Sequence, residues 1–532
     1  MSTGTIATRP AGSSAAHEDG RAPVNPWLIA AAVILPTFME VLDTTIVSVS
    51  LPNIAGNLSA STSEATWTQT SYLISNAIVL PASAWFSSFF GRKRFFLACV
   101  AAFTAASVLC GMAPTLGVLI VARILQGAGG GALQPLSQAI LLESFPPAKH
   151  GQAIAVWGLG VVVAPVLGPV LGGWITDSYS WRLLFYLNLP IGLISLAMIL
   201  RFISDPQYVQ ASKPRRIDVA GFVLLTLWLG TFQTVLDKGQ DADWFSAAWI
   251  CWFTVISVVS LVGLLIRELR SPDPIIDLRV LANRNFAVGT LLFTVIGVIF
   301  YSPQTLLPLF LQNLMGYNAL QSGFAQAPRG IGILVGMPVA GMLTSRIESR
   351  KLVAVGMVLT AVAAWMMSNI DLEVAKSSFL LSNLIQGFGL SLTFVPLTAT
   401  AMGLLRKEQM GNASGLFNLM RNLGASVGIS LATTMVARGA QAHQATLVTH
   451  LTPLDPVLQS RLQAMGAALA QQVTGAQARV MAPGAIYQSL LQQSSLLAYV
   501  DDFRWLALLC FLSMPLVLFL KKVSVTGNVS VH

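Results

Sequence analysis

Two carboxylic acids stand inside the first long apolar stretch of the chain. This stretch begins near Trp27 and ends in FMEVLDTTIVSVSLP (38–52), where Glu40 and Asp43 lie three positions apart. A carboxylate at the centre of a membrane helix costs about 2.5–3.5 kcal/mol on insertion scales, and it persists mostly where it faces a protein interior or a water-filled path. At this spacing both acids share one face of a helix. The pair therefore predicts a functional site inside a membrane.

Three arginines, Arg123, Arg329 and Arg421, also fall within apolar stretches. Buried ion pairs seldom improve on apolar packing, so function is the better explanation for these charges. An acid can take up and release a proton as the protein changes shape, because burial disfavours its charge and a nearby arginine favours it. We predict proton coupling at Asp43, Arg123 and Glu40, and a substrate cavity at Glu40, Thr44, Gln126, Arg421 and Arg329.

Three of these assignments have simpler alternatives. Glu40 and Asp43 are each also compatible with a place in a hydrated cavity wall where the carboxylate does not titrate. Arg329 follows Pro328 near the end of its apolar stretch, so its side chain can instead extend to the membrane surface.

The composition places these residues in an integral membrane protein. Of 532 residues, 54% are hydrophobic and 10% are charged, against about 25% charged in soluble domains. Apolar runs recur along the chain and predict fourteen spans, near 27–50, 65–86, 94–112, 115–137, 152–175, 181–203, 217–235, 248–267, 285–312, 320–345, 351–370, 377–402, 411–437 and 503–521. The four cysteines all lie inside these spans, so the sequence predicts no disulfide framework.

The basic residues supply an independent test of this topology. Most Lys and Arg residues fall in the connections after even-numbered spans and in the two tails, as the positive-inside rule requires of cytoplasmic segments. Both termini are therefore predicted to be cytoplasmic. The net charge of +9 follows from topology, and nucleic-acid binding is not expected.

The chain resembles itself at an offset of about 260 residues. AWFSSFFGRKRF (84–95) aligns with GMLTSRIESRKL (341–352), and RILQGAGGG (123–131) aligns with NLIQGFGLS (383–391). The repeat predicts a six-helix bundle at 27–203, a linker with two inserted spans at 204–284 and a second bundle at 285–522. The polar composition of 1–26, rich in Gly, Ala and Ser, predicts a disordered tail, and a second tail is predicted at 523–532. Within the second bundle, 438–502 is a long polar connection on the periplasmic side that is partly helix-periodic. Such a segment docks a partner, caps the exit or is simply flexible.

A glycine-rich and proline-rich motif, GLGVVVAPVLGPVLGGW (158–174), interrupts the fifth span. Small residues at four-residue spacing let helices approach closely, and proline bends the helix axis. The motif predicts either tight packing alone or a bend that sets which way a pathway opens. Its conformational residues are Gly160, Pro165, Gly168, Pro169, Gly172 and Gly173.

The sequence lacks the common motifs for nucleotide binding, hydrolysis and metal binding. GAGGGALQP (127–135) lacks the Gly-Lys-Ser/Thr ending of a phosphate-binding loop, and the chain has no nucleophile elbow and no H-E-x-x-H metal motif. We therefore expect no enzyme activity, no metal and no cofactor, and energy from a proton gradient.

With these motifs in view, the sequence resembles the major facilitator superfamily, and in particular the fourteen-span drug:proton antiporters of the multidrug-resistance protein B (Emr-type) group. LDTTIVSVSLP (42–52) is similar to the first-helix motif, RILQGAGGG to the fourth-helix motif, and 158–174 to the motif typical of exporters; WRLLFYLNLPIG (181–192) resembles the entry to the sixth helix. The resemblance implies that Asp43 is the coupling acid, and that Arg123 takes part in proton transfer.

One family motif departs from its usual form. The loop pattern of the superfamily has glycine and aspartate where this chain has Ala84 and Ser88, although Gly91, Arg92 and Lys93 remain. The charge contact that the aspartate usually makes is therefore missing, and the sequence does not show what replaces it.

The combined expectation is an inner-membrane exporter that exchanges protons for lipophilic compounds by alternating access. The resemblance implies a periplasmic adaptor and an outer-membrane channel as partners. Three arginines against two acids favour weakly acidic lipophiles over organic cations. The alternatives are a fatty-acid exporter of the same family, a nutrient symporter, and a membrane enzyme or scaffold without transport.

Overall fold

The computed structural model describes residues 25–146, 149–204, 218–272, 274–317, 319–372, 376–449, 451–452, 455–471 and 474–521. Within these ranges all regular structure is helical. The two predicted tails, 1–26 and 523–532, lie outside the described residues, apart from Asn25 and Pro26.

The helices follow the predicted spans closely. Their bounds are α1 Pro26–Asn57, α2 Thr62–Ala65, α3 Trp67–Phe90, α4 Arg92–Met112, α5 Leu116–Gly130, α6 Leu133–Ser144, α7 His150–Ser178, α8 Arg182–Tyr186, α9 Asn188–Phe202, α11 Val219–Lys238, α12 Ala248–Arg270, α13 Arg284–Leu309, α14 Ala319–Thr344, α15 Ser349–Met367, α16 Lys376–Met402, α17 Met410–Val448, α18 Pro456–Leu469 and α19 Gly475–Val517. Among the described residues, 12 helical segments are long and apolar enough to cross a membrane, and they coincide with the first twelve predicted spans. The predicted total of fourteen stays a prediction.

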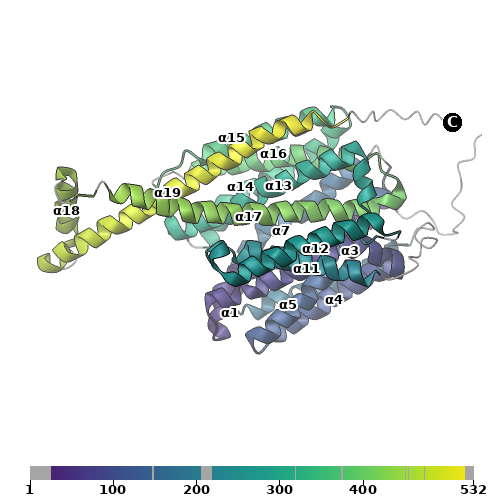
Figure 1. The fold of residues 1–532 in the computed structure, drawn as a ribbon, viewed down its shortest axis with the longest axis horizontal. Coiled ribbons are helices and arrows are strands. Elements are labelled where there is room, and N and C mark those ends of the chain that lie inside the picture. The colour runs from purple at the N-terminus through teal and green to yellow at the C-terminus, as the bar shows by residue number, and fades with distance from the viewer. Residues whose placement is uncertain are drawn as a thin grey trace, which may run out of the picture.

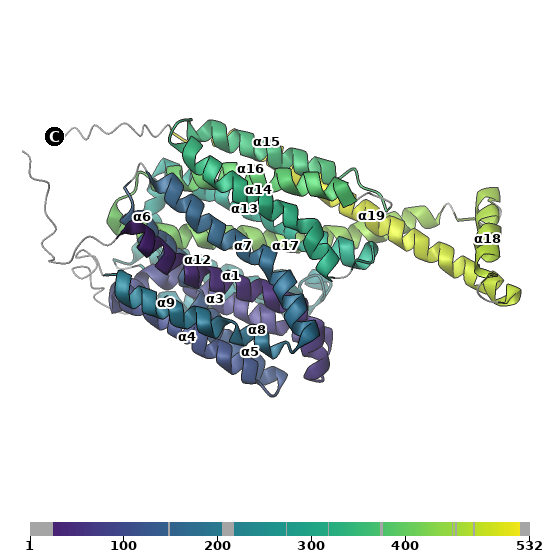
Figure 2. The same ribbon diagram turned by 180° about the vertical axis from the view of Figure 1, so that it is seen from behind.

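The helices form two groups that lie side by side (Figures 1 and 2). One group contains α1 to α9 and the other contains α13 to α19, and they meet where α7 packs against α14 and where α3 and α6 pack against α17. The pair α11 and α12 packs together at the edge of this contact, where α11 touches both α3 and α17. Lys238 Nζ of α11 donates to Thr66 Oγ1 at 2.7 Å, and Thr70 Oγ1 of α3 donates to Asp237. These bonds fasten the extra pair to the first group.

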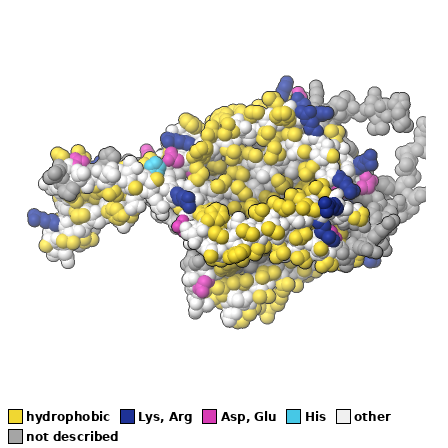
Figure 3. All heavy atoms as spheres, in the orientation of Figure 1, with side chains coloured by type: hydrophobic (Ala, Val, Ile, Leu, Met, Phe, Trp, Pro, Cys, Tyr) yellow, Lys and Arg dark blue, Asp and Glu magenta, His cyan; other side chains and the backbone are white. Residues whose placement is uncertain are grey.

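Two of the last helices extend far beyond the bundle. Much of the segment predicted as a long connection, 438–502, is helical, because α17 continues to Val448 and α19 begins at Gly475. Together with α18 they form a projection at one end of the molecule (Figure 1). Hydrophobic side chains cover most of the bundle surface in Figure 3, whereas the projection carries a mixture of polar and apolar side chains. The surface of the bundle is thus suited to lipid, and the projection to water.

Candidate functional site

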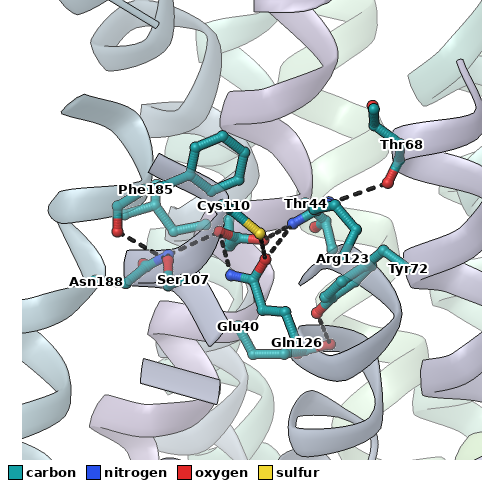
Figure 4. Close-up of polar contacts among 12 residues, drawn as sticks. Glu40, Thr44, Thr68, Tyr72, Ser107, Cys110, Arg123, Gln126, Phe185 and Asn188 are labelled. Carbon is teal, nitrogen blue, oxygen red and sulfur yellow. Dashed lines mark hydrogen bonds and ion pairs between the residues drawn. The ribbon is translucent and has the colours of Figure 1, made fainter. Parts of the chain in front are cut away.

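An ion pair between α1 and α5 forms the centre of the site. Arg123 Nη1 donates to Asp43 Oδ2 at 2.6 Å, and both side chains are almost fully buried, with relative exposures of 0% and 1%. Asp43 Oδ1 accepts two further hydrogen bonds, from Gln126 Nε2 at 2.9 Å and from Asn188 Nδ2 at 2.7 Å. Figure 4 shows these contacts converging between the helices. The structure therefore brings together Asp43, Arg123 and Gln126, three of the residues predicted from the sequence.

The guanidinium of Arg123 is held on several sides. Its Nε donates to the carbonyl of Thr68 at 3.1 Å, its Nη1 also donates to Gln126 Oε1 at 2.7 Å, and its Cζ lies 4.2 Å from the centre of the Tyr72 ring. Its Nη2 is buried without a hydrogen-bond partner among the described residues. A planar fork that bonds a carboxylate, an amide and a backbone carbonyl at once can be supplied by arginine and not by lysine.

Asn188 is a site residue that the sequence reasoning missed. Its Nδ2 donates both to Asp43 and to Ser107 Oγ at 2.9 Å, and Ser107 Oγ donates to the carbonyl of Phe185. The only signal was its position at the entry to the sixth span, inside WRLLFYLNLPIG. Through Asn188 the carboxylate of α1 is linked to α4 and α9 as well as to α5.

Glu40 occupies a separate polar site one helical turn from Asp43. Its Oε1 accepts from Asn76 Nδ2 at 3.1 Å and from the Tyr72 hydroxyl at 3.4 Å, and its Oε2 accepts from Gln134 Nε2 at 2.7 Å. The residue is 4% exposed. Tyr72 thus touches both sites, with its hydroxyl at Glu40 and its ring against Arg123.

Arg421 joins this second site from the other half of the molecule. Its Nη2 donates to Gln134 Oε1 at 2.5 Å and to Asn422 Oδ1 at 3.2 Å. Among the described residues that line a cavity between the halves, Arg421 is the charged one, and the other walls are Gly158, Val161, Ile296, Gly297, Phe300, Tyr301, Met337, Leu390 and Phe394. The cavity is therefore apolar and aromatic, with one cationic group on its wall.

The two remaining predicted cavity residues, Thr44 and Arg329, are not among the described residues that line this cavity. Thr44 donates its hydroxyl to the carbonyl of Val41 at 2.7 Å, on its own helix. Arg329 is 6% exposed, and its Nε and Nη2 are buried without partners in the described part of the chain. Arg329 therefore does not extend to the surface in this structure, and it is not among the described residues that line the cavity around Arg421. Cavity roles for Thr44 and Arg329 stay predictions.

The glycines of the 158–174 motif hold α7 against the helix that carries both acids. A β carbon added to Gly160 would stand 2.4 Å from Ile34 Cγ2, one at Gly168 would stand 2.2 Å from Thr45 Oγ1, and one at Gly172 would stand 3.1 Å from the carbonyl of Ile46. Gly173 differs, since nothing lies within 4 Å of such an atom. Helix α7 runs unbroken from His150 to Ser178, through the backbone of Pro165 and Pro169. The structure thus shows tight packing of α7 against α1, the first of the two roles predicted for the motif.

At the turn between α3 and α4, Arg92 forms a salt bridge that the sequence did not predict. Its Nη1 lies 2.5 Å from Glu143 Oε2 at the end of α6, and both side chains are less than 10% exposed. Gly91, with a φ of 86°, makes the turn between α3 and α4 that places Arg92 there. Lys93 donates to the carbonyl of Leu200. Ser88, where the family has an aspartate, donates to the carbonyl of Trp85 and bonds no other residue in the described part of the chain. Glu143 thus supplies an acid to this end of the bundle.

Comparisons with known proteins agree with this fold. The family model described as Major Facilitator Superfamily matches residues 33–429. The chain is 38% identical over 458 residues to the multidrug export protein EmrB of Haemophilus influenzae, covering 84% of this chain and 89% of that protein. It is 36% identical over 424 residues to the fatty acid resistance protein FarB of Neisseria gonorrhoeae, covering 80% and 83%. A solved structure of a double-tryptophan mutant of XylE aligns with a TM-score of 0.61 at 13% identity, over 94% of this chain and 97% of that chain, which shows the shared fold.

Proposed function

Since the chain belongs to the major facilitator superfamily and, within it, to the multidrug export proteins, we propose that it exports lipophilic compounds in exchange for protons. The observation that carries the proton coupling is the buried contact between Asp43 and Arg123. A proton gradient, rather than a nucleotide or another cofactor, drives the exchange.

Protonation of Asp43 changes the forces between the helices that meet there. The ionised carboxylate accepts three hydrogen bonds, from Arg123, Gln126 and Asn188, which come from α5 and α9. A protonated carboxyl has lost its charge, so it holds Arg123 less strongly and loses one acceptor position. Helix α1 is then free to shift relative to α5 and α9.

The glycine contacts carry this shift toward the second half. Thr45 and Ile46 follow Asp43 by one turn or less and touch Gly168 and Gly172 of α7. Helix α7 in turn packs against α14, where Gly158 faces Met337 and Gly151 faces Gly341. A movement of α1 can therefore change how the two halves meet, as alternating access requires.

The substrates are lipophilic and weakly acidic. The apolar cavity wall accepts aromatic and aliphatic groups, and Arg421 offers the charge for an anionic group. Export of fatty acids is a second candidate, favoured by the similarity to FarB, and it uses the same cavity.

The assembly partners are a periplasmic adaptor and an outer-membrane channel. This proposal rests on the projection formed by α17, α18 and α19, which extends beyond the bundle (Figure 2). The protein then lies in the inner membrane of a bacterium with both termini in the cytoplasm. Replacing α18 by a short Gly-Ser linker should abolish the resistance that the protein gives cells against an exported compound, while leaving transport of that compound in isolated vesicles intact. Unchanged resistance would remove the projection from adaptor binding.

Transport in inverted membrane vesicles tests the central proposal. An acidic lumen should drive a lipophilic acid inward, and adding the compound should consume the pH gradient. Vesicles with Asp43→Asn correct for passive movement of protons by the compound itself. If wild-type and Asp43→Asn vesicles lose the gradient at the same rate, the exchange is not coupled to protons.

A further inference from the structure

A chain of hydrogen bonds crosses from α1 to α17 through a single glutamine. Gln134 of α6 donates its amide nitrogen to Glu40 at 2.7 Å and accepts from Arg421 at 2.5 Å with its amide oxygen. Glu40 and Arg421 are 4% and 5% exposed. The bridge therefore links an acid of the first half to the cationic wall of the cavity, in a place from which water is largely excluded.

The orientation of Gln134 depends on the charge of Glu40. An ionised carboxylate only accepts hydrogen bonds, so Gln134 must turn its NH₂ group to Glu40, and its carbonyl is then directed to Arg421. A protonated Glu40 can instead donate its O–H to the carbonyl of Gln134. That bond competes with Arg421 for the same oxygen, and among the described residues Arg421 then keeps a hydrogen bond to Asn422 alone.

Arg421 then needs another acceptor, and the cavity can supply one. A lipophilic anion seated against Phe300, Phe394 and Met337 would place its charged group at the guanidinium. A carboxylate and a guanidinium form a charge-assisted pair of good geometry, and this pair replaces the bond to Gln134. A proton on Glu40 and an anion on Arg421 thus favour each other.

The groups around Glu40 are compatible with this exchange. Among the described residues, the ionisable groups that act on Glu40 are Tyr72 from α3, which donates to it, and the charges of Asp43 on α1 itself and of Arg421 on α17. The neighbours Asn76 and Gln134 are neutral amides. Arg123 is engaged by Asp43, so its charge is already balanced.

Resting on the proposed export of lipophilic acids, we propose that Arg421 binds the anionic group of the substrate in place of the Gln134 carbonyl, and that Glu40 takes up one proton from solution as this happens. The anion and the proton then cross together without adding net charge to the cavity. The coupling proton that moves inward uses Asp43, which is a different site.

Calorimetry on the purified protein in nanodiscs tests the inference with naphthoate as the probe and neutral naphthamide as its matched control. Titrations in buffers of different ionisation enthalpy measure the protons bound per ligand. Naphthoate should bind with uptake of about one proton near neutral pH, and naphthamide should bind with none. Glu40→Gln should remove the uptake. Arg421→Gln should weaken naphthoate at least about tenfold and leave naphthamide unchanged, and Arg421→Lys should recover part of the difference.

The outcomes separate this inference from the proposed function. Asp43→Asn should lose transport but keep the proton uptake that accompanies naphthoate. Proton release on binding, uptake that survives in Glu40→Gln, or equal weakening of both probes in Arg421→Gln would each overturn the inference. The inference would also be overturned if the wild-type protein transported naphthoate but bound it without taking up a proton. The proposed export function would still hold in that case. The melting temperature of each variant shows whether it is folded.

Discussion

The two halves of the molecule share their helix packing and differ in their chemistry. In the first half, a β carbon added to Gly127 of α5 would stand 2.3 Å from the carbonyl of Tyr72; in the second, one at Gly387 of α16 would stand 2.1 Å from the carbonyl of Arg329. These glycines occupy equivalent positions in the internal repeat. The close approach of two helices is therefore present in both halves.

The residues beside these glycines differ in charge. Arg123 pairs with Asp43, whereas Asn383, its counterpart in the repeat, donates to the backbone carbonyls of Ala325 and Phe379 and to no side chain among the described residues. Gln126 bonds both members of the ion pair, whereas the amide oxygen of its counterpart Gln386 is buried without a partner among the described residues. The comparison shows that the repeat supplies the same close helix packing twice, and that at these equivalent positions the ion pair occurs in the first half.

The largest effect is expected where the predicted proton binds. Asp43→Asn preserves the size of the side chain and its hydrogen bond from Arg123, but an amide cannot take up a proton at physiological pH. Proton-driven drug transport in inverted vesicles should fall to background while the protein level in the membrane stays normal. Asn383→Asp provides the control in the other half, and it should not restore transport to the Asp43→Asn variant. Wild-type transport by Asp43→Asn would remove this residue from coupling.

Removing the arginine should affect stability as well as transport. Arg123→Leu leaves Asp43 as an unpaired buried charge, which costs about 3–5 kcal/mol when a buried pair is broken. Asn383→Leu loses only bonds to backbone carbonyls, so a cost of about 1 kcal/mol is expected. Thermal unfolding in detergent compares the two variants. Equal losses at both positions would show that the two halves are energetically equivalent, against the contrast drawn above.

The sequence predicted the membrane fold and the two charged residues of the central site for a simple physical reason. Ionised groups are so rare in apolar spans that Asp43 and Arg123 are visible without a structure. Asn188 and Gln134 were not assigned to the site. The free-energy cost of burying a neutral amide is small enough that such residues occur throughout a membrane bundle, and only the packing shows which of them face a carboxylate. Glu143 was overlooked because an acid at the end of a span is expected on solvation grounds alone. Similarly, the polar composition of 438–502 did not reveal how far α17 and α19 continue as helices.

The glycines of α7 allow a finer test of how α1 is held. Gly168→Ala places a methyl group 2.2 Å from Thr45 Oγ1, so it should destabilise the protein by about 1–3 kcal/mol and slow transport. Gly173→Ala lies in the same motif with nothing within 4 Å, and it should change stability by less than about 0.5 kcal/mol. Melting temperatures and vesicle transport measure both variants. If the two substitutions behave alike, the contact between α7 and α1 is not what the motif provides.

The smallest effect is expected at Ser88, where the family pattern has an aspartate. Within the described ranges its hydroxyl bonds the carbonyl of Trp85 alone, and Arg92 already has an acid partner in Glu143. Ser88→Asp should therefore change transport by no more than about twofold, because the charge contact at this end of the bundle is already made. Glu143→Gln removes that contact and should slow transport more than Ser88→Asp does, and adding Ser88→Asp to it should recover part of the loss. A strong gain from Ser88→Asp alone would mean that Glu143 is no substitute for the missing aspartate, and that this end of the first half is held less firmly than the salt bridge implies.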